Sequence, residues 1–334
     1  MELRSIALAT GLFLNVIVIP AWAQPPETQH PGNVVINIAG HKVPVVAGGL
    51  YDRYRSNPPL SVIAAEAPSI DLSWFKGLDK KKVDMGFESY SPNFFYQNSR
   101  VTAIYTADLD RLRELIPAEM QNHIQPIQIW PGRGVVALTA FSYNYCDNDS
   151  YHEVALAIAT NKPGRSNLGP ISLISQSMSD DLWGYVVKLP VNTEIARVRG
   201  VVGYNLPKWL TGINRRESDS TVTYEIIDSE TGKLDITLET KKLEDLSDKV
   251  NMVTSNFTNA DKNGQLQYGY AVSRLLSHAS NSDADSVKLT LNGGSLSKYI
   301  ESLKLGKMMK YEYVPDFQSA LYAPAPLASM SASD

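Results

Sequence analysis

Residues 134–159 read GVVALTAFSY, NYCDNDS and YHEVALAIA in succession, and they carry the clearest strand pattern in the chain. The first segment, residues 134–143, is rich in the apolar and β-branched side chains that suit a buried strand. Residues 151–159 have the same character, whereas the segment between them is polar. Two strands joined by a short polar loop predict a β-hairpin.

Further strand patterns lie on both sides of this hairpin. Short apolar or alternating runs predict strands at residues 34–38, 42–46, 100–105, 171–175, 183–189, 195–204, 221–227, 234–240, 286–291 and 310–313. One clear helix pattern begins at Asp108, which suits the N-cap position, and ends before Pro117. Many strands and few helices favour a β-rich α+β fold with a barrel-like body.

The N-terminal residues have the order of an export signal. Residues 1–5 carry one arginine, residues 6–19 are mostly apolar, and Ala21-Trp22-Ala23 provides the small residues of a cleavage site. We therefore predict a signal peptide over residues 1–23, cleaved before Gln24, and a secreted or periplasmic protein. The apolar run is shorter than the ~20 residues that a spanning helix needs, so we expect no membrane span.

The rest of the chain is divided by its composition. We expect a leader and N-terminal extension over residues 24–95, the main domain over residues 96–316 and a disordered tail over residues 317–334, which is rich in Ala, Pro and Ser. Within the extension, the lysine run at residues 80–82 is expected to face solvent.

Charge and cysteine content exclude several classes of partner and site. The formal net charge is -4, and no long basic tract offers an electrostatic drive toward nucleic acid. Cys146 is the only cysteine, so the chain has no internal disulfide and no multi-thiolate metal site. The five histidines are scattered without the spacing of zinc ligands, and we predict no metal site.

One lysine lies in an unusual setting. Residues 199–210, RGVVGYNLPKWL, surround Lys208 with apolar and aromatic side chains. Burial favours the neutral amine, which is the nucleophilic form. A lysine beside a tryptophan more often extends along the ring to water, so the pattern alone leaves both interpretations open.

From about Arg100 to Tyr313 the sequence resembles the acetoacetate decarboxylase family. The similar segments are residues 104–117 (IYTADLDRLRELIP), the hairpin residues 151–153 (YHE) and residues 203–208 (GYNLPK), in that order. The resemblance implies a β-barrel with few peripheral helices, no cofactor, a small keto acid as partner and a homo-oligomer.

The resemblance also implies roles for individual residues. Lys208 matches the lysine that forms a Schiff base with a β-keto acid, and Glu153 matches a glutamate that places or protonates the enamine. The arginine expected at the substrate carboxylate falls on Asn98, with Arg100 two residues further along the same strand face. Tyr151, in the hairpin motif, is a further candidate for substrate binding.

Two positions depart from the family pattern. The decarboxylases carry a second lysine, credited with repelling the proton of the first, where this chain has Trp209, which we include among the substrate-binding candidates. A second acidic residue of the family falls on Leu138. The resulting hypothesis is an exported Schiff-base lyase that decarboxylates a β-keto acid such as acetoacetate. The alternatives are a Schiff-base aldolase or dehydratase, and a non-catalytic protein that binds a small ligand.

Overall fold

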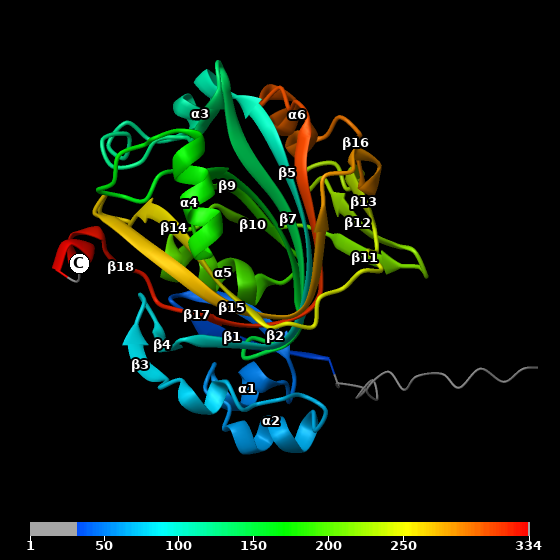
Figure 1. Cartoon of the computed structure of the whole chain (residues 1–334). Helices are drawn as coiled ribbons and strands as arrows, with labels where there is room; N and C mark the ends of the chain where they lie inside the picture. The colour runs from blue at the N-terminus through cyan, green and yellow to red at the C-terminus, as the bar shows by residue number, and fades with distance from the viewer. Residues whose placement is uncertain (1–31, 333–334) are drawn as a thin grey trace, which may run out of the picture.

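The hairpin predicted at residues 134–159 is present and forms part of a closed barrel. In the computed structural model, which describes residues 32–332, β7 (Arg133–Cys146) pairs antiparallel with β8 (Tyr151–Ala159). The pairing continues through β9, β14, β15, β17 and β5 back to β7, so that seven strands of the described chain close on themselves (Figure 1). The other barrel strands are β5 (Asn93–Asp108), β9 (Asp181–Val191), β14 (Asn251–Ala260), β15 (Leu266–Asn281) and β17 (Met308–Leu321).

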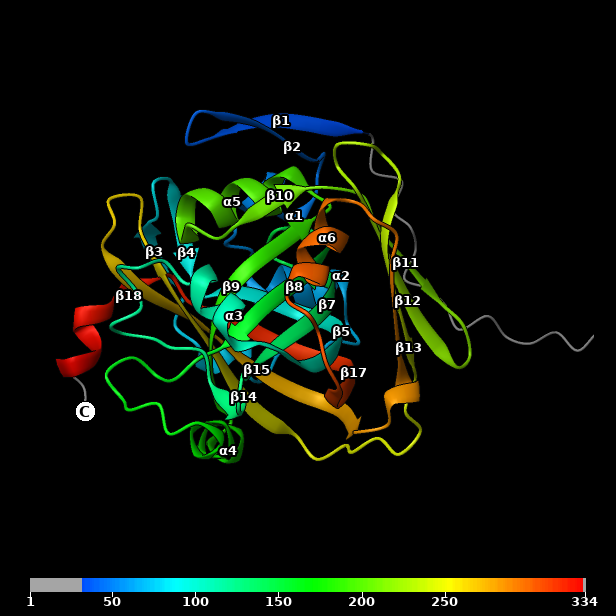
Figure 2. The same cartoon turned by 90° about the horizontal axis from the view of Figure 1, so that it is seen from above.

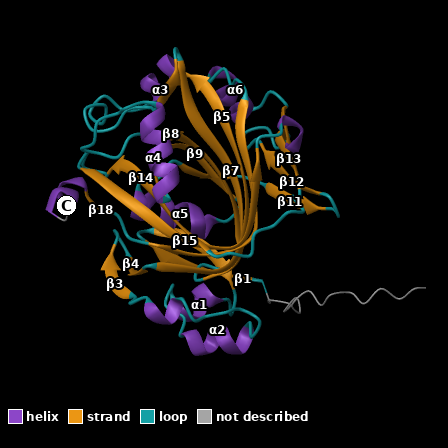
Figure 3. Ribbon diagram, in the orientation of Figure 1, coloured by secondary structure: helices purple, strands orange, loops and turns teal. Residues whose placement is uncertain are grey.

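Smaller strands and helices surround the barrel, as Figure 3 shows. A four-stranded sheet contains β11 (Ile213–Glu217), β12 (Thr221–Ile227), β13 (Leu234–Lys241) and β16 (Val287–Leu291). The remaining strands are β1 (Asn33–Ile38), β2 (His41–Val46), β3 (Lys81–Asp84), β4 (Glu88–Ser91), β6 (Gln128–Trp130), β10 (Lys208–Leu210) and β18 (Ala325–Pro326). The α-helices are α1 (Leu50–Tyr54), α2 (Leu60–Glu66), α3 (Leu109–Leu115), α4 (Pro170–Ser179), α5 (Glu194–Tyr204) and α6 (Ser295–Ser302). No helix among the described residues is long and apolar enough to cross a membrane.

The register of β5, β7 and β8 separates the inside of the barrel from the outside. Val101, Ala140 and Val154 are directly opposite one another and belong to the largest apolar cluster, together with residues of β12 and β13. The four-stranded sheet lies beside the barrel, so this face is the outer one (Figure 2). Successive side chains of a strand point to opposite faces. The neighbouring row, Arg100 and Glu153 on either side of β7, therefore faces the barrel interior.

The predicted helix after Asp108 is confirmed, because the Asp108 carboxylate accepts a hydrogen bond from the backbone N–H of Arg111 and α3 follows directly. The strands predicted at residues 34–38, 42–46, 221–227 and 234–240 are also confirmed, and they pair as the hairpins β1–β2 and β12–β13. The signal peptide prediction concerns residues that lie outside the described part of the chain, and it stays a prediction.

The N-terminal extension is joined to the barrel rather than separate from it. Its hairpins and helices cover one end of the barrel (Figure 1). The predicted boundary at residue 96 falls inside β5, which already begins at Asn93. The extension and the barrel are thus one folded unit at this strand.

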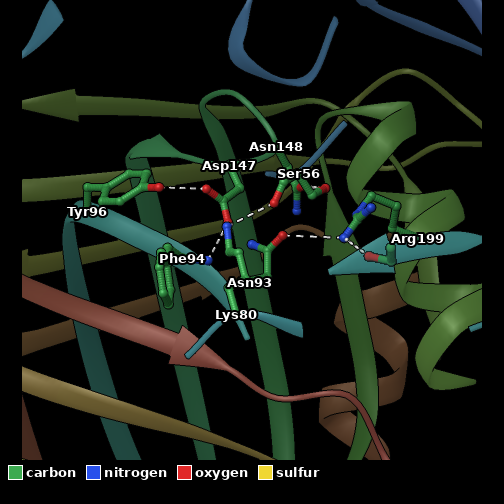
Figure 4. Close-up of polar contacts among 9 residues, drawn as sticks. Ser56, Lys80, Asn93, Phe94, Tyr96, Asp147, Asn148 and Arg199 are labelled. Carbon is green, nitrogen blue, oxygen red and sulfur yellow. Dashed lines mark hydrogen bonds and ion pairs between the residues drawn. The ribbon is translucent and has the colours of Figure 1, made fainter. Parts of the chain in front are cut away.

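A buried ion pair fixes the extension to the barrel, and the prediction that Lys80 faces solvent is wrong. The Lys80 Nζ donates to Asp147 Oδ2 at 2.6 Å, and the Lys80 side chain is only 10% exposed (Figure 4). Asp147 also accepts hydrogen bonds from the backbone N–H of Phe94 and from the Tyr96 hydroxyl. Burial lowers the pKa of Lys80 and raises that of Asp147, and these three donors offset the cost for the carboxylate.

Two predicted strands are helices. Residues 171–175 lie in α4, which begins with Pro170 at the first helical position after Gly169, a geometry that suits a helix start. Residues 195–204 lie in α5, where Ile195, Val198 and Val202 have helical spacing and pack against the extension. The many β-branched residues of α5 favour a strand only weakly, and tertiary packing overrides that preference.

The predicted disorder of residues 317–334 is wrong for the part that the structure describes. Phe317 is buried at 2% exposure, and β17 continues to Leu321 between β15 and β5. Composition rich in Ala and Pro suggested disorder, but this segment supplies one wall of the barrel, and pairing on both edges orders it.

We predict that Lys80→Met destabilises the protein by about 3–5 kcal/mol, because the variant leaves the Asp147 carboxylate buried without its cation. Urea unfolding of both proteins measures this difference. Lys81→Met is the matched control, since the Lys81 side chain is 74% exposed and its removal should leave stability unchanged. Equal stability of the Lys80 variant and the unmodified protein would show that the Lys80–Asp147 ion pair does not stabilise the fold.

Candidate functional site

Lys208 and Glu153 meet inside the barrel. Lys208 begins β10, which pairs in parallel with β9, and its Nζ donates to Glu153 Oε2 at 2.5 Å. Each of the two side chains is 9% exposed. The two residues are far apart in sequence, and the barrel brings together the pair that the sequence motifs singled out.

Two tyrosines complete the surroundings of this pair. The Tyr143 hydroxyl lies 3.4 Å from Glu153 Oε1, and the ring of Tyr151 lies 5.8 Å from Lys208 Nζ. Burial, reinforced by the Glu153 carboxylate, holds the pKa of both phenols well above the ordinary value. Both hydroxyls therefore stay neutral, and Glu153 is the group that can accept a proton from Lys208.

Helix α5 shapes the path of the Lys208 side chain. It ends at Asn205, which has the left-handed conformation with φ 48°, and the chain then turns through Pro207 into β10. A Cβ on Gly200 would lie 2.3 Å from Lys208 Cδ and 2.5 Å from its Cε. Only a glycine at this position lets the lysine stem lie against the helix and direct its amine to Glu153.

The N-terminal extension contacts α5 on the side away from Lys208. Arg199 is 4% exposed and donates to Ser89 Oγ at 3.0 Å and to Asn93 Oδ1 at 3.3 Å (Figure 4). Its guanidinium also lies over the rings of Tyr51 and Phe87. The extension thus positions α5, and α5 positions Lys208.

Arg100 faces the same interior, but it does not contact Lys208. Its side chain is 10% exposed, lies 3.6 Å from Glu312 and stacks near Phe317, while its Nε is buried without a hydrogen-bond partner. Burial raises the pKa of Glu312, but Arg100 and Lys310 outweigh this effect and hold it below the ordinary value. Arg100 is two strand spacings, or about 10 Å, from Glu153 along the row.

Two of the substrate-binding candidates have other contacts. The Asn98 amide nitrogen donates to the carbonyls of Phe95 and Phe317, while its Oδ1 is buried without a hydrogen-bond partner. Trp209 points away from Lys208, because neighbours on a strand face opposite sides, and Lys188 Nζ lies 5.8 Å from its ring. Trp209 therefore does not face the Lys208 amine, and substrate binding by Asn98 stays a prediction.

Tyr143, Arg199 and Glu312 lie in or near the site and were not predicted. Tyr143 is directly opposite Tyr151 in the β7–β8 register, so counting back from the predicted hairpin would have placed it beside Glu153. Leu138 belongs to the outer apolar cluster, so the spacing that assigned it to an active-site position points to the wrong face. No sequence signal identifies Arg199 or Glu312. Residues 32–332 contain no group of three His, Cys, Asp or Glu side chains suited to a metal ion.

We predict that Gly200→Ala separates the lysine from Glu153 while the fold persists. The added methyl occupies the space of the lysine stem, and a misplacement of this kind can lower a reaction rate about 100-fold. Alanine favours a helix over glycine by up to about 1 kcal/mol, so thermal stability should not fall. Acetylation of Lys208 followed by peptide mass spectrometry, with Gly77→Ala as the unhindered control, measures the change. An unchanged labelling rate would contradict the role of Gly200.

This chain is similar to known proteins in its three-dimensional structure but not in its sequence. No family model and no curated protein matches this chain. The solved structure of acetoacetate decarboxylase from Legionella pneumophila matches with a TM-score of 0.52 and 12% identity, covering 71% of this chain and 87% of that one. The enduracididine biosynthesis enzyme MppR complexed with pyruvate matches with a TM-score of 0.50 and 12% identity, covering 71% and 91%. The predicted fold is confirmed, and this chain has the acetoacetate-decarboxylase-like fold.

Proposed function

We propose that the protein is an exported enzyme that binds a β-keto acid through an imine on Lys208 and releases carbon dioxide. The observation that carries the proposal is the contact of Lys208 Nζ with Glu153 Oε2 at 2.5 Å inside the barrel. An amine and a carboxyl group at this distance are suited to exchange a proton, and the barrel excludes bulk water from both. The chain supplies these groups itself, and the reaction needs no further cofactor.

The steps follow from the two groups. Glu153 takes a proton from Lys208, and the neutral amine attacks the ketone carbon of the substrate. Loss of water gives an imine, and Glu153 returns the proton to its nitrogen, so that the protonated imine acts as the electron sink. The bond to the carboxylate carbon breaks, carbon dioxide leaves, and its electron pair forms an enamine. Glu153 then takes up one proton from water and delivers it to the enamine carbon, and hydrolysis of the resulting protonated imine releases the ketone and restores the Lys208 ammonium.

Arg100 is the residue of the interior best suited to hold the substrate carboxylate. It lies in the same row as Glu153, and its Nε is a buried donor that no protein group satisfies. A buried donor of this kind gains a charge-assisted hydrogen bond when a carboxylate enters. The contact with Glu312 at 3.6 Å holds the guanidinium in place without occupying it fully.

A Schiff-base aldolase or dehydratase is the second candidate. The side chain of Trp209 points away from Lys208, so this chain lacks the second cation that the decarboxylases carry at that position. Loss of this cation favours a Schiff-base reaction other than decarboxylation. The likeness to MppR, a structure described as complexed with pyruvate, supports the same candidate at the level of the fold. Incubation with pyruvate and an aldehyde, followed by product analysis, distinguishes condensation from decarboxylation.

We predict that sodium borohydride traps an adduct on Lys208 in the presence of a β-keto acid. Reduction converts the imine to a stable amine, and the mass of the Lys208 peptide increases accordingly. Lys208→Ala should lose the adduct and the release of carbon dioxide, whereas Lys188→Ala, which removes a lysine from the outer side of β9, should keep both. Saturable binding of the keto acid that survives in Lys208→Ala would instead favour a non-catalytic binding protein.

We predict that Glu153→Gln keeps the imine but loses turnover. Solvent can take the proton from Lys208 more slowly than Glu153 does, so borohydride still traps the substrate during a long incubation. Protonation of the enamine loses its acid, and the release of carbon dioxide should fall by about 10²–10⁴-fold. Tyr143→Phe is the control for the other polar neighbour of Glu153 and should have the smaller effect. Full turnover by Glu153→Gln would remove Glu153 from the mechanism.

A further inference from the structure

Lys208 lies on a strand that is paired on one edge only. β10 pairs in parallel with residues 189–191 of β9, and no other strand within the described part of the chain pairs with it. On the same edge of β9, residues 181–184 pair with β14, while β8 occupies the opposite edge. Residues 185–188 lie between β14 and β10 without a described strand beside them on that edge. A gap in the barrel wall therefore separates the strand that carries Lys208 from β14.

Two asparagine side chains form hydrogen bonds across this gap. The amide nitrogen of Asn259, on β14, donates to the carbonyl of Tyr204, the last residue of α5. The amide nitrogen of Asn205 donates in the other direction, to the carbonyl of Ala260 on β14. A carbonyl only accepts hydrogen bonds, so in both cases the nitrogen of the amide is the atom that faces it. These bonds connect the end of α5 to β14 where strand pairing is absent.

The Asn259 bond is the better shielded of the two. Asn259 is 7% exposed and Tyr204 is 5% exposed, whereas Asn205 is an exposed residue. A hydrogen bond away from water is electrostatically stronger, and a buried carbonyl that loses its donor keeps the cost of its desolvation. Asn205 has a second role, because it adopts the left-handed conformation, with φ 48°, that ends the helix. We therefore attribute most of the link between α5 and β14 to Asn259.

The turn between α5 and β10 transmits this link to the lysine. The turn is short, and Pro207 restricts its backbone. The backbone N–H of Lys208 donates to the carbonyl of Leu206 at 2.7 Å, and the side chain then reaches Glu153 at 2.5 Å. A displacement at the start of this turn would therefore also displace the Lys208 amine.

We propose that Asn259 is a positioning residue for the reaction of Lys208, since its amide holds the turn after α5 against β14 and so keeps the amine at Glu153. The inference rests on the proposed function and adds a residue of β14 to the strands that supply the reacting pair. The Asn259 amide nitrogen donates to the backbone of Tyr204, so Asn259 acts through the turn and not on the substrate.

The variant Asn259→Leu, which has a similar size and no donor, tests the proposal by two measurements. With saturating acetoacetate, the rate of borohydride trapping on Lys208 should fall about 100-fold, because a misplacement of about 1 Å can have this effect. Without substrate, acetylation of Lys208 relative to the buried Lys80 should rise about 5-fold, since one net hydrogen bond no longer opposes local opening. A purely structural role would raise the labelling of both lysines together.

Two further variants serve as controls. Asn256→Leu is the matched one, because the Asn256 amide also bonds to β9, at Asp181 Oδ1 and the Leu182 carbonyl, but where β14 and β9 are paired. It should keep both the trapping rate and the labelling ratio. Asn205→Gly keeps the left-handed conformation and removes only the exposed bond. It should change both quantities in the same direction as Asn259→Leu, but less.

The outcomes distinguish the role of Asn259 from the proposed function. An unchanged labelling ratio in Asn259→Leu, or an equal change in Asn256→Leu, overturns the role of Asn259. If Asn259→Leu does not fold, Asn205→Gly decides by the same ratio, because its substitution lies at an exposed position. If the unmodified protein traps no keto acid on Lys208, the proposed function fails. The labelling ratio then still decides whether Asn259 holds the lysine in place.

Discussion

The ion pair between Lys208 and Glu153 imposes a constraint on everything around it. Each ion that leaves water costs several kcal/mol, and the pair is stable only where geometry and further hydrogen bonds compensate. The barrel meets this condition, since β8 supplies the carboxylate, Tyr143 supplies a further hydrogen-bond donor and β10 supplies the amine at 2.5 Å. A shift of β8 by one residue would turn Glu153 to the outer face, so the register of the central hairpin decides whether the site exists.

Local patterns predicted most of the barrel strands, because a hairpin is fixed by residues close in sequence. The two helices α4 and α5 were missed for different reasons. In α4 the start signal, Pro170 after Gly169, outweighs the apolar run that predicted a strand. In α5 the valines suggested a strand, and only the packing of Ile195 and Val198 against the extension decides for a helix. The order of residues 317–321 likewise depends on β15 and β5, which are distant in sequence.

Site residues within short sequence motifs could be predicted. Residues that reach the site only through contacts between distant parts of the chain could not. The motifs around residues 153 and 208 singled out the two residues that the structure places in contact. Arg199 bonds to residues more than 100 positions away, and no spacing rule points to them. At Asn98 the structure adds what the sequence could not give, since the amide nitrogen is bound to two backbone carbonyls and its oxygen is buried without a partner.

The N-terminal extension takes on a physical role in this arrangement. Trp209 faces away from Lys208, so that position places no cation beside the amine, whose surroundings are set by burial and by Glu153. The extension contributes to this burial, because β2 and α1 pack on α5 and Arg199 bonds to β4 and β5. Gly200 of the same helix lies against the aliphatic part of the Lys208 side chain. A displacement of the extension that moves α5 would therefore also move the Lys208 amine. The extension thus helps to position Lys208 through α5, although none of its residues contacts the amine in the described structure.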